Sequence, residues 1–182
     1  MFKKAVPLMF AFTLLASTAF AQERKDLQVF RDISDSVNRY SQFTIFDNIE
    51  ASVTDGRVVL SGWVTMPYKK NDLERRVRKI DGVNEVENKI DVLPVSQFDD
   101  ELRFRIARAI YSNSSFWNYA AMANPPIHIV VNHGRVTLTG VVQSNVERML
   151  ARSLATGFGS FEVTNALKTD DEVKAELEKI GS

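Results

Sequence analysis

Cysteine is absent from this chain of 182 residues, so no disulfide stabilises it and no thiol is available to carry a lipid. Net charge is absent too, because 23 basic side chains balance 23 acidic ones. A chain of this charge disfavours non-specific binding to nucleic acid, which needs a basic surface. The composition therefore predicts no disulfide, no lipoprotein anchor and no nucleic-acid partner.

Residue types that carry catalysis are also scarce. The two histidines, His128 and His133, belong to no H-x-x-x-H or H-E-x-x-H motif of the kind that binds a metal. The sequence shows no glycine-rich phosphate loop, no Gly-x-Ser-x-Gly motif and no paired-carboxylate motif. The acidic run 99–101 falls where a helix is expected to start, and acidic residues stabilise that end of a helix without any chemistry. We therefore predict a protein that is not an enzyme and has no metal and no cofactor.

The N-terminus has the pattern of a secretory signal peptide. Lys3 and Lys4 precede an apolar run over 5–16, and small residues follow up to Ala21. This pattern predicts cleavage before Gln22 and export to the periplasm of a bacterium. The run is short for a bilayer about 30 Å thick, although a retained membrane anchor is the alternative. The mature chain has 21 basic and 23 acidic side chains, a net charge of −2.

Two similar stretches recur at a spacing of 78 residues, 53–64 and 131–142. Each has a turn residue, a glycine and then the pattern Arg-Val-x-Leu-x-Gly-x-Val. Apolar and polar residues that alternate after such a turn are typical of a β-hairpin with a half-buried strand. Gly56 and Gly134 suit the positive φ of the turn, whereas Gly62 and Gly140 indicate a bulge or a close approach of another element. The chain is therefore a tandem repeat.

Hydrophobic spacing predicts the same order of elements around both hairpins. The predicted fold class is α+β, with two tandem α-β-β-α-β units, each a small three-stranded sheet packed against two helices. The expected helices cover 26–40, 67–80, 99–112 and 145–158, and the expected closing strands cover 83–92 and 161–167. The predicted organisation is a signal peptide over 1–21, units over 25–93 and 98–169, a linker over 94–97 and an acidic tail over 170–182. We expect the tail to be either a short docked helix or a frayed end.

Spacings of three and four residues predict which side chains of each helix face the core. The expected core residues are Leu27, Phe30, Ile33 and Val37 in the first helix, Leu73, Val77 and Ile80 in the second, Phe98, Leu102, Ile106 and Ile110 in the third, and Val146, Leu150, Leu154 and Phe158 in the fourth.

The two hairpins, together with a closing Val-x-Asn at 86–88 and 163–165, make the chain similar to the BON domain family. That family includes osmotically inducible periplasmic proteins, some secretins, haemolysins and mechanosensitive channels. The resemblance covers nearly the whole mature chain and implies a periplasmic or outer-membrane-associated protein that contacts phospholipid or envelope proteins. Some relatives act as periplasmic chaperones. Because its motif consists of strand and turn residues, the resemblance is specific for the fold and says little about function.

A basic segment, 69–79, is the first candidate binding surface. Its six basic and two acidic side chains give a charge of +4. Anionic headgroups attract such a face by about 1 kcal/mol per basic residue, less at high salt, and an ordinary solvated helix face is the alternative. The expected helix over 99–112 offers a weaker candidate, Arg105 and Arg108. This pair either binds phosphate or forms an ordinary surface pair with Glu101. The candidate phospholipid contacts are Lys69, Lys70, Arg75, Arg76, Arg78, Lys79, Arg105 and Arg108.

An insertion over 112–126, present in the second unit alone, is the second candidate surface. Phe116, Trp117 and Tyr119 lie close together in it, which is unusual for a solvated loop. These aromatics either contact a partner or the headgroup layer, or they cover the groove between the two units as part of a core. Trp63, at the end of the first hairpin, has the same two interpretations.

Two functions of different classes follow from these surfaces. The first is peripheral attachment to an anionic phospholipid membrane, which helps the envelope withstand osmotic or similar stress. The alternative is a periplasmic chaperone or adaptor that binds envelope proteins through the aromatic insertion.

Overall fold

The structure, a computed structural model, describes residues 16–180 of the chain. Residues 1–15 of the predicted signal peptide lie outside that range, and residues 16–21 form the start of helix α1. Across the described residues, no helix combines the length and the hydropathy that a membrane span requires.

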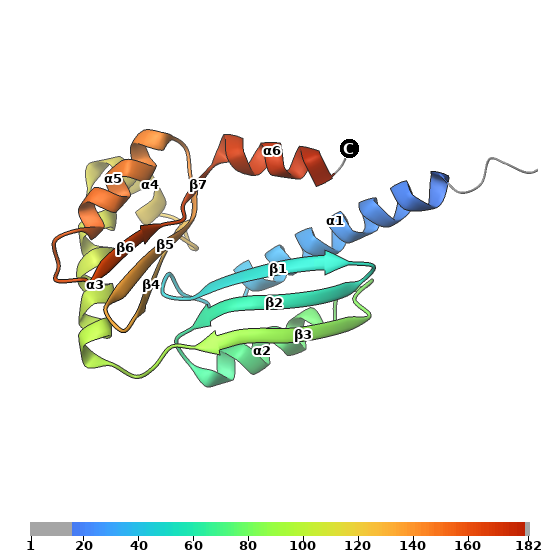
Figure 1. Cartoon of the computed structure of the whole chain (residues 1–182), viewed down its shortest axis with the longest axis horizontal. Helices are drawn as coiled ribbons and strands as arrows, with labels where there is room; N and C mark the ends of the chain where they lie inside the picture. Colours follow the sequence, from blue (N-terminus) through green and yellow to red (C-terminus); the bar gives the residue numbers. More distant parts are fainter. Residues whose placement is uncertain (1–15, 181–182) are drawn as a thin grey trace, which may run out of the picture.

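The elements follow the predicted tandem order (Figure 1). The first unit contains α1 (Ala16–Asn38), β1 (Asn48–Thr54), β2 (Arg57–Val64), α2 (Pro67–Val77) and β3 (Glu85–Val92). The second contains α3 (Gln97–Tyr111), the 3-10 turn η1 (Ser114–Phe116), α4 (Trp117–Ala120), β4 (Ile127–Asn132), β5 (Arg135–Val142), α5 (Asn145–Ala155), β6 (Glu162–Asn165), β7 (Lys168–Thr169) and α6 (Asp170–Ile180). The predicted α+β class with two tandem units is confirmed.

Each unit has an antiparallel hairpin and a parallel closing strand. The first sheet has the order β1-β2-β3, with Ala51 opposite Leu60 across the hairpin. The second has the order β4-β5-β6, and β7 also pairs with β5, so the expected single closing strand is interrupted. Both parts keep one register, since Asn165 faces Leu138 and Lys168 faces Val141.

Glycine is required in both hairpins for the two reasons that the sequence suggests. The turn glycines, Gly56 and Gly134, have φ of 74° and 75°. At Gly62 an added Cβ would lie 2.1 Å from the carbonyl oxygen of Asn48, and at Gly140 1.8 Å from that of Pro126. The strand glycines therefore mark close approaches of the backbone that leads into the first strand of each hairpin.

The first helix of each unit buries most of the residues that spacing predicts, Ile33 and Val37 in α1 and Leu102, Ile106 and Ile110 in α3, but leaves one predicted phenylalanine exposed. In α1 the buried residues are Val29, Ile33 and Val37, while Phe30 is exposed; in α3 Phe98 is exposed. An aspartate of each helix accepts hydrogen bonds from the hairpin turn and thereby ties the helix to that turn. Asp26 accepts from Asp55 and Gly56, and Asp99 from His133 and Gly134.

Helix α5 also departs from the expected packing, because its fully buried residues are Ala151 and Ala155. Val146 is exposed, whereas Leu150, Leu154 and Phe158 are only partly buried against the core. Two small side chains allow the helix to approach its neighbours closely, so the larger side chains remain at the edge of the contact.

The two units touch through residues 43–48, which join α1 to β1 and which we call the docking segment. The N–H of Ile129 donates to the carbonyl of Ile45 at 2.7 Å, and the rings of Phe46 and Phe104 meet edge to face at 5.2 Å. Ile45 and Phe46 thereby pack against the core of the second unit. The short linker after β3 is consistent with this direct contact.

The acidic tail forms α6, which docks on the second unit. Arg148 pairs with Glu172 at 2.9 Å, and Lys168 pairs with Glu176 at 2.7 Å. Thr169 and Glu172 cap the helix reciprocally, since each side chain accepts from the other's N–H. The tail is therefore helical and is tied to the second unit at its first turns, while most of its described side chains remain exposed.

Candidate functional site

Lys69 lies inside the first unit and not on the exposed face of α2, so its prediction as a membrane contact is wrong. Its side chain is 4% exposed, and its ammonium donates to Asp47 Oδ2 at 2.6 Å and to Thr65 Oγ1 at 2.8 Å. Burial alone would raise the pKa of Asp47, but hydrogen bonds from Lys69, Thr65 and Thr44 outweigh it and hold that pKa below its usual value. Asp47 lies 22 residues before Lys69, so the spacing within the helix gave no sign of the pair.

Arg76 also has a structural role, because it joins α2 to α1. Its guanidinium lies 5.2 Å from the centre of the Tyr40 ring and donates to the carbonyl of Ser36 at 3.2 Å. The Tyr40 hydroxyl donates to Asp72 at 2.7 Å, and burial together with this carboxylate raises the pKa of Tyr40. Arg76 is therefore only partly available to a ligand.

The outer face of α2 keeps most of the predicted basic surface. Tyr68 and Arg75 lie seven residues apart in α2, so they share that face, and Tyr68 is 48% exposed. Lys79 is exposed in the turn that follows the helix. Arg75 pairs with Asp72 and Arg78 with Glu74, both within the helix. Without Lys69, the segment has five basic and two acidic side chains, a charge of +3.

The two candidate arginines on α3, Arg105 and Arg108, differ in their contacts. Arg105 forms the surface pair with Glu101 that spacing allowed. Arg108 is exposed and forms no ion pair with any described residue. The exposed Phe104 precedes them, so α3 presents an apolar ring beside one cation that is free within residues 25–178.

Two of the three aromatics in the insertion belong to a core, as one of the two interpretations had it, but to the core of the second unit and not to a cover over the groove between the units. Phe116 is fully buried, and Tyr119 packs against it with ring centres 6.0 Å apart. The Tyr119 hydroxyl donates to Glu147 at 2.7 Å, and burial, together with that hydrogen bond, raises the pKa of Tyr119 to about 12. Trp117 alone of the three is exposed, at 74%.

Trp63 and His128 both lie where the two units meet. Trp63 is half-buried beside a cleft of about 280 Å³ whose walls include Glu50 of the first unit and Thr139 of the second. His128 Nδ1 is 2.6 Å from the carbonyl oxygen of Asp47, and its ring is 5.3 Å from that of Phe43. Burial lowers the pKa of His128 against the opposing effect of this contact. These residues therefore serve the contact between units.

No catalytic or metal-binding constellation emerges from these positions. In the part of the chain that the structure describes, His, Asp and Glu form no group of three that could hold a metal ion. The candidate surfaces are instead three separate features: the basic face of α2, the exposed Trp117 and the cleft between the units.

A family model for the BON domain matches residues 30–94 and again residues 99–177. The two matches together span more than half of the chain. The chain belongs to the BON domain family. BON domains are associated with phospholipid binding and with proteins of envelope or osmotic stress, and they are generally non-catalytic binding modules.

Comparison with characterised proteins adds little to this assignment. No curated protein matches the chain. Among solved structures, CdsD, a structural protein of the type III secretion system of Chlamydia trachomatis, is similar over 83% of this chain and 97% of its own, with 14% identity and a TM-score of 0.29. Its C-terminal domain is similar over 75% of this chain and 94% of its own, with 13% identity and a TM-score of 0.28. Likeness at this level says nothing about the function of this BON protein.

One feature of the second BON unit has no counterpart in the sequence-based predictions. A groove of about 460 Å³ runs along α5 and β6, lined by Arg148, Met149, Arg152 and Asn165 among others. Arg148 is engaged by Glu172 of α6. No short motif marks this groove, because its residues come from a helix and a strand that only the fold brings together.

Proposed function

We propose that this tandem BON protein is a non-catalytic protein of the bacterial envelope that attaches peripherally to anionic phospholipid membranes under osmotic or similar stress. The observation that carries the proposal is the exposed surface of α2 and the turn after it, where the exposed cations Arg75 and Lys79 follow the exposed ring of Tyr68 along the chain. An amphipathic ring beside cations suits the headgroup layer, where tyrosine is enriched.

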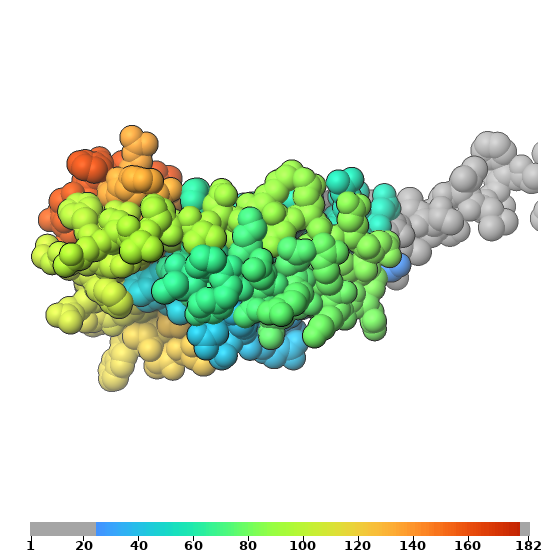
Figure 2. Space-filling model, turned by 90° about the horizontal axis from the view of Figure 1, so that it is seen from below, coloured from blue at the N-terminus to red at the C-terminus, as the bar shows by residue number. Residues whose placement is uncertain are grey.

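Electrostatics determines how strong this attachment is. Each basic residue near an anionic surface contributes about 1 kcal/mol, and the contribution disappears beyond a Debye length of about 8 Å at physiological salt. With a charge of +3 on the segment, α2 supports a salt-sensitive and reversible contact. Figure 2 shows α2 on the same side of the molecule as the linker into α3, so the start of α3 lies on the side that would approach the bilayer.

Co-sedimentation of the mature protein, from Gln22, with neutral and anionic liposomes at low and physiological salt tests this proposal. Charge reversal at Arg75→Glu with Lys79→Glu changes the charge by four units and should weaken binding to anionic vesicles by roughly three orders of magnitude, at about 1 kcal/mol for each unit of charge. Arg76 is left intact because it holds α2 to α1. The matched control, Arg152→Glu with Lys174→Glu, changes the net charge equally on other helices and should bind more tightly than the α2 variant. Equal binding by both variants would show that α2 does not form the membrane contact.

A second candidate function, a chaperone or adaptor for envelope proteins, is favoured by Trp117 with Met122. Both are exposed on the insertion, and a large exposed indole on a monomer is a common anchor for a protein partner. Trp117→Ala should then lose suppression of client aggregation while liposome binding is unchanged. Retained suppression would count against the insertion as the client site.

A further inference from the structure

The outer edge of β4 in the second unit is closed by three different groups. Along this edge, Ile127, Ile129 and Val131 direct their backbone groups away from β5. The Tyr111 hydroxyl donates to the carbonyl of Ile127 at 2.5 Å, the N–H of Ile129 donates to Ile45, and Arg103 donates to the carbonyl of Val131 at 2.6 Å. All three side chains of this edge are fully buried.

The equivalent edge of β1 in the first unit lacks all three closures. Ile49, Ala51 and Val53 occupy the same places opposite β2, and their outward backbone groups form no hydrogen bond with any described residue. Their side chains are only half-buried. An edge strand with unpaired N–H and C=O groups is a template for another strand.

The reason for the difference lies on the first helix of each unit. Asp26 and Asp99 hold their hairpin turns in the same way, which sets the equivalence of the two helices. Four residues further on, α3 has Arg103, which reaches Val131, whereas α1 has the apolar Phe30. The first unit therefore lacks the arginine that closes the second.

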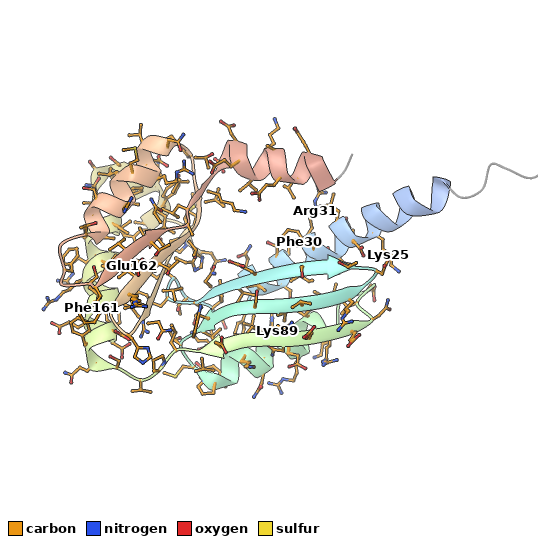
Figure 3. All side chains as sticks on the ribbon, in the orientation of Figure 1. Lys25, Phe30, Arg31, Lys89, Phe161 and Glu162 are labelled. Carbon is orange, nitrogen blue, oxygen red and sulfur yellow. The ribbon has the colours of Figure 1, made fainter. Side chains whose placement is uncertain are left out.

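The docking segment shows how this kind of edge accepts a chain. In the second unit, Ile45 lies against the backbone of Ile129, and Phe46 packs on Phe104 of α3. Five residues after the turn aspartate, the position of Phe104 in α3 is taken by Arg31 in α1, which is exposed and forms no ion pair with any described residue. Figure 3 shows Phe30 and Arg31 on the part of α1 that lies beside β1.

We propose that the outer edge of β1 binds an extended polypeptide segment of a client protein, which adds to the first sheet as a fourth strand. The segment places an apolar side chain beside Phe30, where the half-buried Ile49, Ala51 and Val53 offer apolar surface. It places an acidic side chain beside Arg31. The corresponding pair in the second unit is Phe46 of the docking segment and Phe104 of α3. Backbone hydrogen bonds to Ala51 and its neighbours supply the affinity and these two contacts the selectivity.

The test uses the mature protein and a synthetic peptide that copies its own docking segment with one change, acetyl-Phe-Thr-Ile-Glu-Asp-Asn-amide, in which glutamate replaces the second phenylalanine. Backbone amide resonances are followed during titration, and amide hydrogen exchange is measured at saturation. The Ala51 amide should become protected about tenfold or more, as expected for one new hydrogen bond, whereas the Ile129 amide should not change. Protection at Ile129 instead would overturn the proposal, because the peptide would then compete for the closed edge.

Two blocking variants, Phe30→Arg and Ala51→Pro, test the site independently, so one remains informative if the other fails to fold. Phe30→Arg installs the arginine of the second unit and should weaken peptide binding about tenfold by occupying the carbonyl of Val53, whereas Phe30→Leu should bind as the wild type does. Ala51→Pro removes the outward N–H, which an edge strand tolerates, and should weaken binding similarly. Unchanged binding in both blocking variants refutes the proposal. So does concentration-dependent protection of Ala51 without peptide, because a second copy would then be the occupant.

Discussion

The two BON units hold their hairpin turns in the same way but differ at the outer edge of the hairpin. In each unit an aspartate from the first helix accepts both N–H groups of the hairpin turn, from Asp55 and Gly56 in one and from His133 and Gly134 in the other. Beyond that shared contact, the outer edge of the second hairpin is closed by its neighbours, whereas that of the first is open. A repeated pattern of strand residues thus specifies the fold of a unit without specifying its surface.

The same contrast appears at the start of the second helix of each unit. In the first unit the N–H of Thr65 donates to Asp47, which Lys69 of α2 neutralises. In the second unit the N–H of Gln143 donates to Glu147, which occupies in α5 the place of Lys69 in α2. The first unit thus depends on a buried ion pair where the second uses one carboxylate from its own helix.

The largest expected effect comes from breaking that buried pair. Lys69→Met leaves the carboxylate of Asp47 buried without its cation and should lower the free energy of unfolding of the first unit by about 3–5 kcal/mol. Urea unfolding would be followed by the fluorescence of Trp63 in a Trp117→Phe background. The control Lys79→Met, in the exposed turn after α2, should cost at most about 0.5 kcal/mol. A similar loss in both variants would show that the pair contributes no more than a surface charge does.

A smaller effect separates the two turn aspartates. Asp99 is buried and accepts at 2.9 and 2.8 Å, whereas Asp26 is half-buried and accepts at 2.9 and 3.2 Å. Asp99→Ala should therefore cost about 2–3 kcal/mol and Asp26→Ala about 1 kcal/mol, because water can replace more of the bonding at the exposed turn. Urea unfolding detected at Trp117 and at Trp63, in matching single-tryptophan backgrounds, measures the two losses. The reverse order would mean that burial does not distinguish the two turns.

The tandem fold and the turn glycines could be predicted from the sequence because both depend on local patterns. The core faces of α1 and α3 were largely predictable too, but the exposure of Phe30 and Phe98 was not, since the seating of each helix also depends on Asp26 and Asp99, which accept hydrogen bonds from turns about 30 residues away in the chain. The candidate sites were less predictable still. Lys69 stands in a basic run that suggests a surface, and the sequence leaves Phe116 and Tyr119 open between a partner contact and a core. Only the packed structure shows the carboxylate or core that each one meets. The exposed positions among the predicted contacts, such as Arg75 and Trp117, stay predictions.

The smallest expected effect concerns His128, whose position in the first unit is taken by the exposed Glu50. Burial at the contact with the docking segment keeps the pKa of His128 below its usual value. The unfolded chain binds that proton with a pKa of about 6.5, so the stabilisation is complete above this pH and is lost as the pH falls from there through the folded pKa, by at most about 1.4 kcal/mol per pH unit. Comparing the pH dependence of unfolding for wild type and His128→Gln isolates this contribution from that of Asp47. The variant should lose less stability than wild type below that pH. Parallel curves for wild type and His128→Gln would mean that the contact between the units tolerates a charged imidazole. Water would then reach His128 more readily than its burial indicates.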